Sequence, residues 1–240
     1  MEFHCVFRSH VGLRRATNED AVLCRADLGL WAIADGMGGH DSGEVASAMV
    51  VDRLGADDLG LGLAVRTDAA RRVLTDVNER LVALARTRHT GRTIGTTVVA
   101  IIAVDQAFAC LWTGDSRAYR ARAGAIARLT RDHSLVQTLI DAGEIDPAEA
   151  AAHPGANIVT RAVGAAPTLD VEIVRGDIGC GDTLLLASDG LTRLLSDEEL
   201  LTGLQAPHLD DAADEFIDLC LSRGAPDNVS FVIVRAGEPR

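Results

Sequence analysis

The sequence predicts an α+β fold: a four-layer α-β-β-α sandwich in which two packed antiparallel sheets are flanked by helices. Strand-like runs follow one another through short turns, and one-sided helical patterns separate the groups of strands. Regular alternation of strand and helix, which would indicate a doubly wound parallel sheet, is missing from the pattern. With 240 residues, 48% of them hydrophobic, the chain can bury one sizeable core, so we expect a single domain over residues 1–240.

Strands are expected where short apolar and β-branched runs are bounded by turn residues. They fall at residues 3–8, 20–25, 30–34, 94–104, 107–112, 117–122, 168–174, 183–187 and 229–234. Because most of these runs are joined by short turns, we expect antiparallel pairing.

Helices are expected where apolar residues recur every three or four positions. This spacing occurs in residues 45–54, 73–84 and 212–220, and each pattern is one-sided, as in a helix that covers a sheet. Residues 133–163 differ, because they combine short helical stretches, several charges and a His153-Pro154-Gly155 break. These features predict a small surface subdomain.

Charge limits the possible partners. The 23 basic residues are outnumbered by 35 acidic ones, and the formal net charge of −12 argues against binding to nucleic acid or to an anionic membrane. The first ten residues lack the apolar core of a signal peptide, and no segment is long and uncharged enough to span a bilayer. We therefore expect a cytoplasmic protein without membrane insertion.

Five cysteines are spread along the chain without a Cys-x-x-Cys pair: Cys5, Cys24, Cys110, Cys180 and Cys220. This spacing suits reduced thiols in the core better than disulfides or a zinc site. We expect these side chains to act as small buried apolar groups.

Aspartates recur where buried strands end. Asp35 and Asp189 each follow an apolar run and precede a glycine, Asp115 follows Leu-Trp-Thr-Gly, and Asp227 lies just before the last strand. A single Asp-Gly is usually only a turn, but four such acids from distant parts of the chain indicate a site.

A cluster of these acids would need cations, because two charges about 4 Å apart repel by roughly 4 kcal/mol at an effective dielectric of 20. Oxygen ligands without neighbouring His or Cys favour hard ions, Mg²⁺ or Mn²⁺, over zinc. Gly36 can offer its carbonyl oxygen to a metal, while Gly38 and Gly39 let the backbone pass close to a bulky ligand.

The residues after these glycines allow two interpretations. Asp41 and Glu44 have the spacing of a capping box, which assigns them to the start of a helix. His40 is either a solvated loop residue or a proton donor beside the metals.

The order of the motifs resembles that of the metal-dependent type 2C (PPM) family of serine/threonine protein phosphatases, in particular its bacterial branch. The matching blocks are 15–20 (RATNED), 35–40 (DGMGGH), 95–97 (GTT), 114–119 (GDSRAY), 129–134 (LTRDHS), 160–164 (TRAVG), 188–191 (SDGL) and 227–229 (DNV). They cover nearly all of the chain, and such a set is highly specific.

The resemblance implies a role for each motif residue. Asp35, Asp189, Asp227 and the Gly36 carbonyl would bind two Mn²⁺ or Mg²⁺ ions. Asp20 and Glu19 would support this centre from outside or through water, and Asp115 would help to hold a weaker third ion. Arg15 would clamp the substrate phosphate. Residues 133–163 would be the flap that helps to select substrate.

The implied reaction is hydrolysis of phosphoserine and phosphothreonine in proteins, reversing a serine/threonine kinase. Two ions roughly 3.5–4 Å apart can lower the pKa of a bridging water and aim the resulting hydroxide in line at phosphorus. Arg15 would bind the non-bridging phosphate oxygens through its planar fork. Phosphorylated proteins and a cognate kinase are the partners that the family implies.

Two positions depart from the pattern. Eukaryotic members commonly have a histidine where this chain has Met37, so the proton donor to the leaving group would be a metal-bound water or His40. Many members have an acid where this chain has Arg193, which weakens the expected third metal site and makes an Arg193–Asp115 ion pair an alternative.

Other functions fit less well. No cysteine is separated by five residues from a following arginine, as a cysteine phosphatase requires, and no predicted strand is followed by the Asp-x-Asp of a haloacid-dehalogenase-like phosphatase. A pseudoenzyme that binds phosphoproteins without turnover is the rival from a different class. Arg15 and all the principal acids argue against it.

Overall fold

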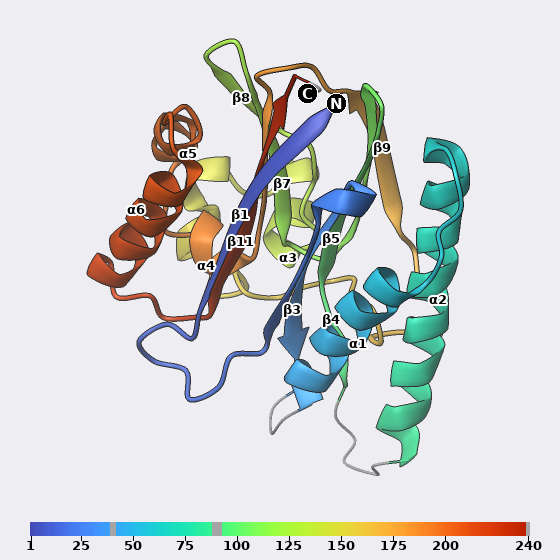
Figure 1. The fold of residues 1–240 in the computed structure, drawn as a ribbon. Coiled ribbons are helices and arrows are strands. Elements are labelled where there is room, and N and C mark those ends of the chain that lie inside the picture. Colours follow the sequence, from blue (N-terminus) through green and yellow to red (C-terminus); the bar gives the residue numbers. More distant parts are fainter. Residues whose placement is uncertain (39–41, 88–92, 239–240) are drawn as a thin grey trace.

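A computed structural model gives the structure of the chain and describes residues 1–38, 42–87 and 93–238. Two antiparallel sheets lie face to face (Figure 1). The first contains β1 (Glu2–His10), β11 (Val229–Gly237), β10 (Thr183–Ala187), β7 (Arg117–Arg122) and β8 (Ala125–Arg128), in that order. The second contains β2 (Asp20–Arg25), β3 (Leu30–Met37), β5 (Val98–Val104), β6 (Ala107–Thr113) and β9 (Glu172–Asp177), with β4 (Gly95–Thr96) paired to β3.

Helices cover the outer face of each sheet (Figure 1). The second sheet is covered by α1 (Ser42–Ala56) and α2 (Leu63–Thr87), and the first by α5 (Asp197–Leu204) and α6 (Leu209–Ser222). The short α4 (Asp189–Thr192) follows β10 directly, and η1 (Ala26–Leu28) follows β2. The predicted α-β-β-α sandwich is therefore confirmed.

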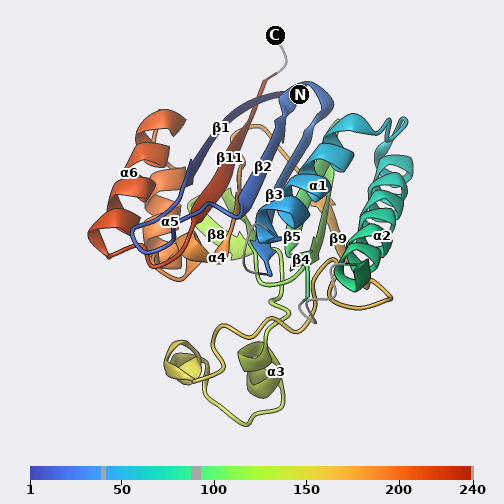
Figure 2. The same cartoon turned by 90° about the horizontal axis from the view of Figure 1, so that it is seen from below.

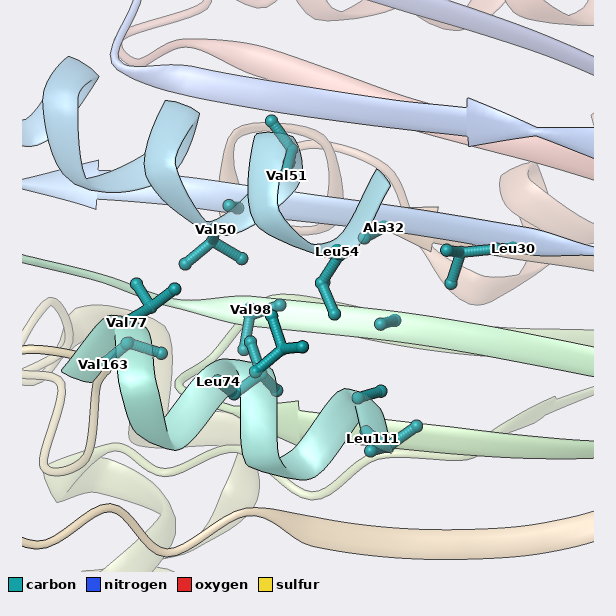
Figure 3. Packing of buried hydrophobic residues seen from close by; sticks show 14 of the residues in the cluster. Leu30, Ala32, Val50, Val51, Leu54, Leu74, Val77, Val98, Leu111 and Val163 are labelled. Carbon is teal, nitrogen blue, oxygen red and sulfur yellow. The ribbon is translucent and has the colours of Figure 1, made fainter. Parts of the chain in front are cut away.

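Residues of β3 show why three apolar layers form. Alternate side chains of a strand point to opposite faces, so Trp31 and Ile33 lie between the sheets while Leu30 and Ala32 face the helices. Figure 3 shows Leu30 and Ala32 beside Leu54 of α1, with Leu74 of α2 nearby. Because both faces of the strand are buried, its sequence is continuously apolar, and each fully buried large side chain stabilises the fold by ~1.5–3 kcal/mol.

The predicted strands are present, but the run 94–104 divides at Thr97 into β4 and β5, and two further differences occur. The run 168–174 pairs with β6 only from Glu172 onward, and the ladder continues to Asp177; Leu169 and Val171 precede it and pack against the same apolar layer as Ile173 of the strand. β8 was not predicted, since its residues are mostly exposed and lack the alternation that marks a half-buried strand. It pairs with β7 through a tight turn at Ala123 and Gly124, both with positive φ (49° and 81°).

Residues 133–163 project from the layered body beside one end of the sheets (Figure 2). They contain α3 (Leu135–Asp141) and the 3₁₀ helix η2 (Pro147–Ala152), which begins with a capping box between Asp146 and Glu149. Short helices and mostly exposed or half-buried side chains agree with the expected surface character of this segment.

The cysteine prediction is correct in part. Cys110 and Cys220 are buried in apolar layers, but Cys5 and Cys24 are half-buried and Cys180 is exposed. The prediction of core thiols was therefore wrong for Cys180, which lies in the turn before β10 where little apolar surface surrounds it. Among the described residues, no helix is long and apolar enough to cross a membrane.

Candidate metal centre

Antiparallel pairing brings the predicted acids to one end of the sandwich. Asp20 at the start of β2 lies opposite Asp35 near the end of β3. Asp189 comes two residues after the end of β10, and Asp227 comes two residues before the start of β11, the antiparallel neighbour of β10. Asp115 follows β6 across the same gap between the sheets. The sequence spacing alone could not place these ends together.

A cavity of about 490 Å³ opens at this end. It is lined by most of the predicted site residues, namely Arg15, Glu19, Asp35, Gly36, Asp115, Asp189, Arg193 and Asp227. Met37 and Gly38 also line it, as do Asn157, Ile158 and Val159 from the segment 133–163. Asp20 is not part of this lining, but it is paired with Asp35 in the strand register. The structure thus brings together every predicted site residue that it describes.

Two arginines pair with the acids. Arg15 Nη2 lies 2.7 Å from Asp227 Oδ2, and the Arg15 side chain is 52% exposed. Arg193 Nη2 lies 2.8 Å from Asp189 Oδ2 and 3.2 Å from Asp115 Oδ2. Arg193 also donates a hydrogen bond to Asn157. The expected Arg193–Asp115 contact is confirmed, and Arg193 bridges two acids rather than one.

Burial and mutual repulsion disfavour the charged forms of these acids. Burial, and next the nearby Asp20 and Asp189 carboxylates, raise the pKa of Asp35 well above its ordinary value. Burial raises the pKa of Asp20 to about 7 and that of Asp115 to about 6. Asp189 also has a raised pKa, with burial the main cause and Arg193 opposing it. A cation at this position would relieve both costs.

Asp20 offers the clearest test of whether an ion fits. Its Oδ2 accepts a hydrogen bond from Ser188 Oγ at 2.9 Å, but its Oδ1 is buried and has no hydrogen-bond partner among the described residues. A buried carboxylate oxygen normally has a partner. Across the described part of the chain, no group of three His, Cys, Asp or Glu side chains is close enough together to hold a metal ion without rearrangement. The donors are nevertheless all oxygen, which fits Mg²⁺ or Mn²⁺.

Two glycines permit the close backbone approaches of the site. A Cβ on Gly36 would collide with the carbonyl oxygens of Gly43 and Glu19, so only glycine lets β3 pass this close to the start of α1. A Cβ on Gly190 would collide with the carbonyl oxygen of Asn228. This second approach holds Asp189 beside the chain that carries Asp227.

Neutral side chains outside the predicted set hold the acids in position. Asn228 accepts from Glu19 N–H at 2.9 Å and donates to the carbonyl oxygens of Val11 and Thr17, at 2.9 and 3.0 Å. Asp35 N–H donates to Thr97 Oγ1 at 3.1 Å. Thr97 lies in the GTT block and Asn228 in the DNV block. The sequence therefore identified both motifs, but it did not predict these hydrogen bonds.

His133 is another residue that sequence reasoning left without a role. The residue is 7% exposed, and its ring stacks on Trp112 with the ring centroids 6.2 Å apart. Gly114 N–H donates to His133 Nδ1 at 3.1 Å, so Nε2 carries the proton and donates to Glu172 Oε1 at 3.0 Å. His133 therefore fixes the turn that carries Asp115. Gly39, His40 and Asp41 lie outside the described residues.

The four-layer sandwich with an acidic, oxygen-lined cavity at one end defines a class, the domain of metal-dependent protein phosphatases. A family profile described as Protein phosphatase 2C matches residues 9–227, and the chain belongs to this family. The predicted fold and family are thereby confirmed.

Two serine/threonine phosphatases are similar to this chain in sequence. Serine/threonine protein phosphatase PstP of Mycobacterium tuberculosis is 40% identical over 232 residues, which cover 94% of this chain and 43% of PstP. The chain thus spans less than half the length of that relative. Serine/threonine phosphatase stp of Listeria monocytogenes is 36% identical over 240 residues, covering 96% of this chain and 95% of stp.

Two solved structures are also similar. PppA, a key regulatory component of T6SS in Pseudomonas aeruginosa, has a TM-score of 0.92 at 39% identity, with 98% of each chain covered. The catalytic domain of PstP in complex with two manganese ions has a TM-score of 0.86 at 36% identity, covering 98% of this chain and 99% of that one. The manganese in that relative agrees with the hard-ion preference of the oxygen donors here.

Proposed function

We propose that the protein hydrolyses phosphoserine and phosphothreonine in other proteins, using two bound Mn²⁺ or Mg²⁺ ions. The observation that carries this proposal is the gathering of Asp35, Asp189 and Asp227 with Arg15 around one cavity. The cavity combines strong negative charge with two guanidinium groups, of which Arg15 is the more exposed, and this suits a site that binds divalent ions and then a phosphate anion.

The ions would be held by the carboxylates of Asp35, Asp189 and Asp227 and by the Gly36 carbonyl. Asp20 and Glu19 would support them from behind, with the partnerless Asp20 Oδ1 as one acceptor. When bound, Mn²⁺ or Mg²⁺ supplies Lewis-acid activation of water and of the phosphoryl group. The raised pKa of the buried acids matters here, because it makes the cluster depend on cations for its charged state.

Arg15 would bind the substrate phosphate. Among the described residues it contacts Asp227 through Nη2 alone, and half of the side chain is exposed. The planar guanidinium can therefore turn further donors toward the cavity and meet two phosphate oxygens at once. Met37, which lines the same cavity, has no proton to give to the leaving alkoxide. His40 or a water bound in the site would give that proton.

Asp115 would be the main protein ligand of a weaker third ion. Its Oδ2 already contacts Arg193, whose positive charge competes with a cation at this position. We therefore propose that this site binds a third ion weakly and mostly through water.

We also propose that residues 1–240 form one phosphatase domain and that residues 133–163 form its flap. Asn157, Ile158 and Val159 line the site cavity, and a second cavity of about 420 Å³ lies next to it, lined by flap residues such as Val136 and Pro147. A phosphoprotein bound at Arg15 would meet this surface. A cognate serine/threonine kinase and its targets are the partners we propose, with a cytoplasmic location.

The proposal is tested with a phosphothreonine peptide and the purified chain in Mn²⁺. We expect release of inorganic phosphate, loss of release in chelator, and recovery after Mn²⁺ is restored. Asp227→Asn serves as the inactive control with the same fold. A chain that binds the phosphopeptide but never releases phosphate would instead be a pseudoenzyme. Phosphoproteomics after gene deletion, complemented by either form, would identify the substrates.

A further inference from the structure

Two cysteines from different sheets face each other at one side of the sandwich. Cys5 lies on β1 and Cys24 on β2, the terminal strands of the first and second sheets. Their Sγ atoms are 2.9 Å apart. Apolar atoms count as touching at about 4 Å, so this pair is already closer than ordinary packing requires.

Strand register explains why these two side chains meet. Cys5 pairs with Val234 of β11, and Cys24 pairs with Trp31 of β3. Val234 and Trp31 both belong to the apolar layer between the sheets, and the two cysteines pack against that layer. The thiols thus point into the space between the sheets from opposite sides, at its half-exposed margin.

We propose that Cys5 and Cys24 form a reversible disulfide that joins the two sheets when the protein meets a peroxide. An S–S bond is about 2.0 Å long, so the sulfur atoms need to approach by less than an ångström. The inference is independent of phosphatase activity. In a reducing compartment such a bond would form only transiently.

The reaction balances with peroxide as the oxidant. The Cys5 sulfur attacks one peroxide oxygen, which breaks the O–O bond, releases water and leaves a sulfenic acid on Cys5. The Cys24 sulfur then attacks that sulfur and expels the hydroxyl group, which leaves as water with the Cys24 proton. Two thiols are oxidised and one peroxide is reduced. Burial, and next the neighbouring Cys5 thiol, raise the pKa of Cys24, which disfavours the Cys24 thiolate as the species that attacks the peroxide.

The bond would close a loop that contains Arg15, Glu19 and Asp20, but far from the cavity. Cys24 is four residues beyond Asp20 on β2, which is roughly 13 Å along a strand. The disulfide therefore restrains the unfolded chain without contacting the metal centre. We expect a Tm higher by about 5–10 °C and phosphatase turnover within about twofold of the reduced protein.

Peptide mapping tests the bond directly. All 23 basic residues of the chain are arginines, so trypsin releases Cys5 in peptide 1–8 and Cys24 in peptide 16–25. The full chain is treated with hydrogen peroxide, its remaining thiols are blocked with N-ethylmaleimide, and it is then digested. We expect the two peptides to appear linked, with two hydrogens lost, and to separate after dithiothreitol.

Matched variants make the test specific. Cys180→Ala removes the exposed thiol and should keep both the link and the rise in Tm. Cys5→Ser and Cys24→Ser should lose both while keeping the fold, because serine is nearly the same size. The proposal is overturned if peroxide leaves peptides 1–8 and 16–25 unlinked, whether as thiols or as sulfinic acids, or links either one to Cys180 or to a second chain.

Discussion

The two ends of β10 carry aspartates in opposite electrostatic settings. Asp182 precedes the strand and Asp189 follows it. Burial acts to raise the pKa of Asp182, but Arg122 and the Gly179 N–H outweigh it, and this pKa is lowered overall. At the other end the pKa of Asp189 is raised, because burial and Asp227 together outweigh the nearby Arg193.

The contacts explain the difference. Arg122 donates to both oxygens of Asp182, at 2.7 and 2.5 Å, and Gly179 N–H adds a third bond at 2.7 Å. Asp189 has Arg193 at 2.8 Å but also faces the other site carboxylates. The negative charge of Asp182 is thus balanced by Arg122 and a backbone N–H within the fold. The site aspartates outnumber the two arginines that contact them, so part of their negative charge has no positive partner among the described residues. The Asp189 end of β10 therefore has the electrostatic character of a cation-binding site, and the Asp182 end has that of a structural ion pair.

Removal of metal should produce the largest contrast between the two ends. Chelator should abolish phosphate release, because the Asp189 end needs divalent ions for the reaction. Mn²⁺ at about 100 times its Kd should stabilise the fold by roughly 2.7 kcal/mol, seen as a higher Tm in calorimetry. Full turnover in chelator would show that the acids have no catalytic metal.

Asp189→Asn should lower kcat/KM by roughly 100-fold or more, since one ligand charge is lost from the centre. The free energy of unfolding should stay the same or rise, because one repelling charge is removed from a buried cluster. The rise in Tm caused by Mn²⁺ should disappear. Asp35→Asn and Asp227→Asn should behave alike, and a variant that unfolds instead would contradict a functional role.

Arg15→Ala should reduce kcat/KM by about 10–100-fold, mainly through a higher KM, because its grip on phosphate is similar in the ground and transition states. Arg15→Lys should recover little of the loss, since an ammonium lacks the planar fork. The exposed neighbour Arg14 provides the matched control, and Arg14→Ala should leave the kinetics unchanged. Equal effects of the two variants would mean that the phosphate clamp lies elsewhere.

Arg193→Asp should convert a competing cation into a metal ligand. We expect a third Mn²⁺ in metal titration or anomalous diffraction, next to Asp115, while the two-ion core is unchanged. Arg193→Gln separates the two effects, because it removes the positive charge without adding a ligand. Three tightly held ions in the unmodified protein would refute the competing role of Arg193.

The Asp182 end should show the smallest effect on activity. Asp182→Asn should destabilise the fold by about 1–2 kcal/mol through lost charged hydrogen bonds to Arg122, with kcat/KM within about twofold of the parent. Since the pKa of Asp182 is lowered in the fold, its contribution is present above about pH 4 and is lost as pH falls further. Urea unfolding at pH 7 and pH 3 should show the difference between the two proteins shrinking in acid.

The sequence by itself determined the strands with two buried faces and the three longest helices, α1, α2 and α6, whereas the shorter α5 was not predicted. The Thr183–Ala187 run was predicted without error at its boundaries, because continuous apolar residues allow few alternatives. The aspartates at strand ends and the motif order also identified the family. These signals are local, and each can be read from a short window of residues.

Only the tertiary structure decided which charged groups and which thiols from distant elements contact each other. The sequence suggested that Arg193 contacts Asp115, but not that it also reaches Asp189. It gave no sign that Cys5 and Cys24 would meet, because their separation matches no motif and their contact depends on how two sheets pack. Likewise the buried oxygen of Asp20 became visible only once β2, β3 and β10 were in place. Burial and pairing are properties of the assembled layers, so no single stretch of sequence carries them.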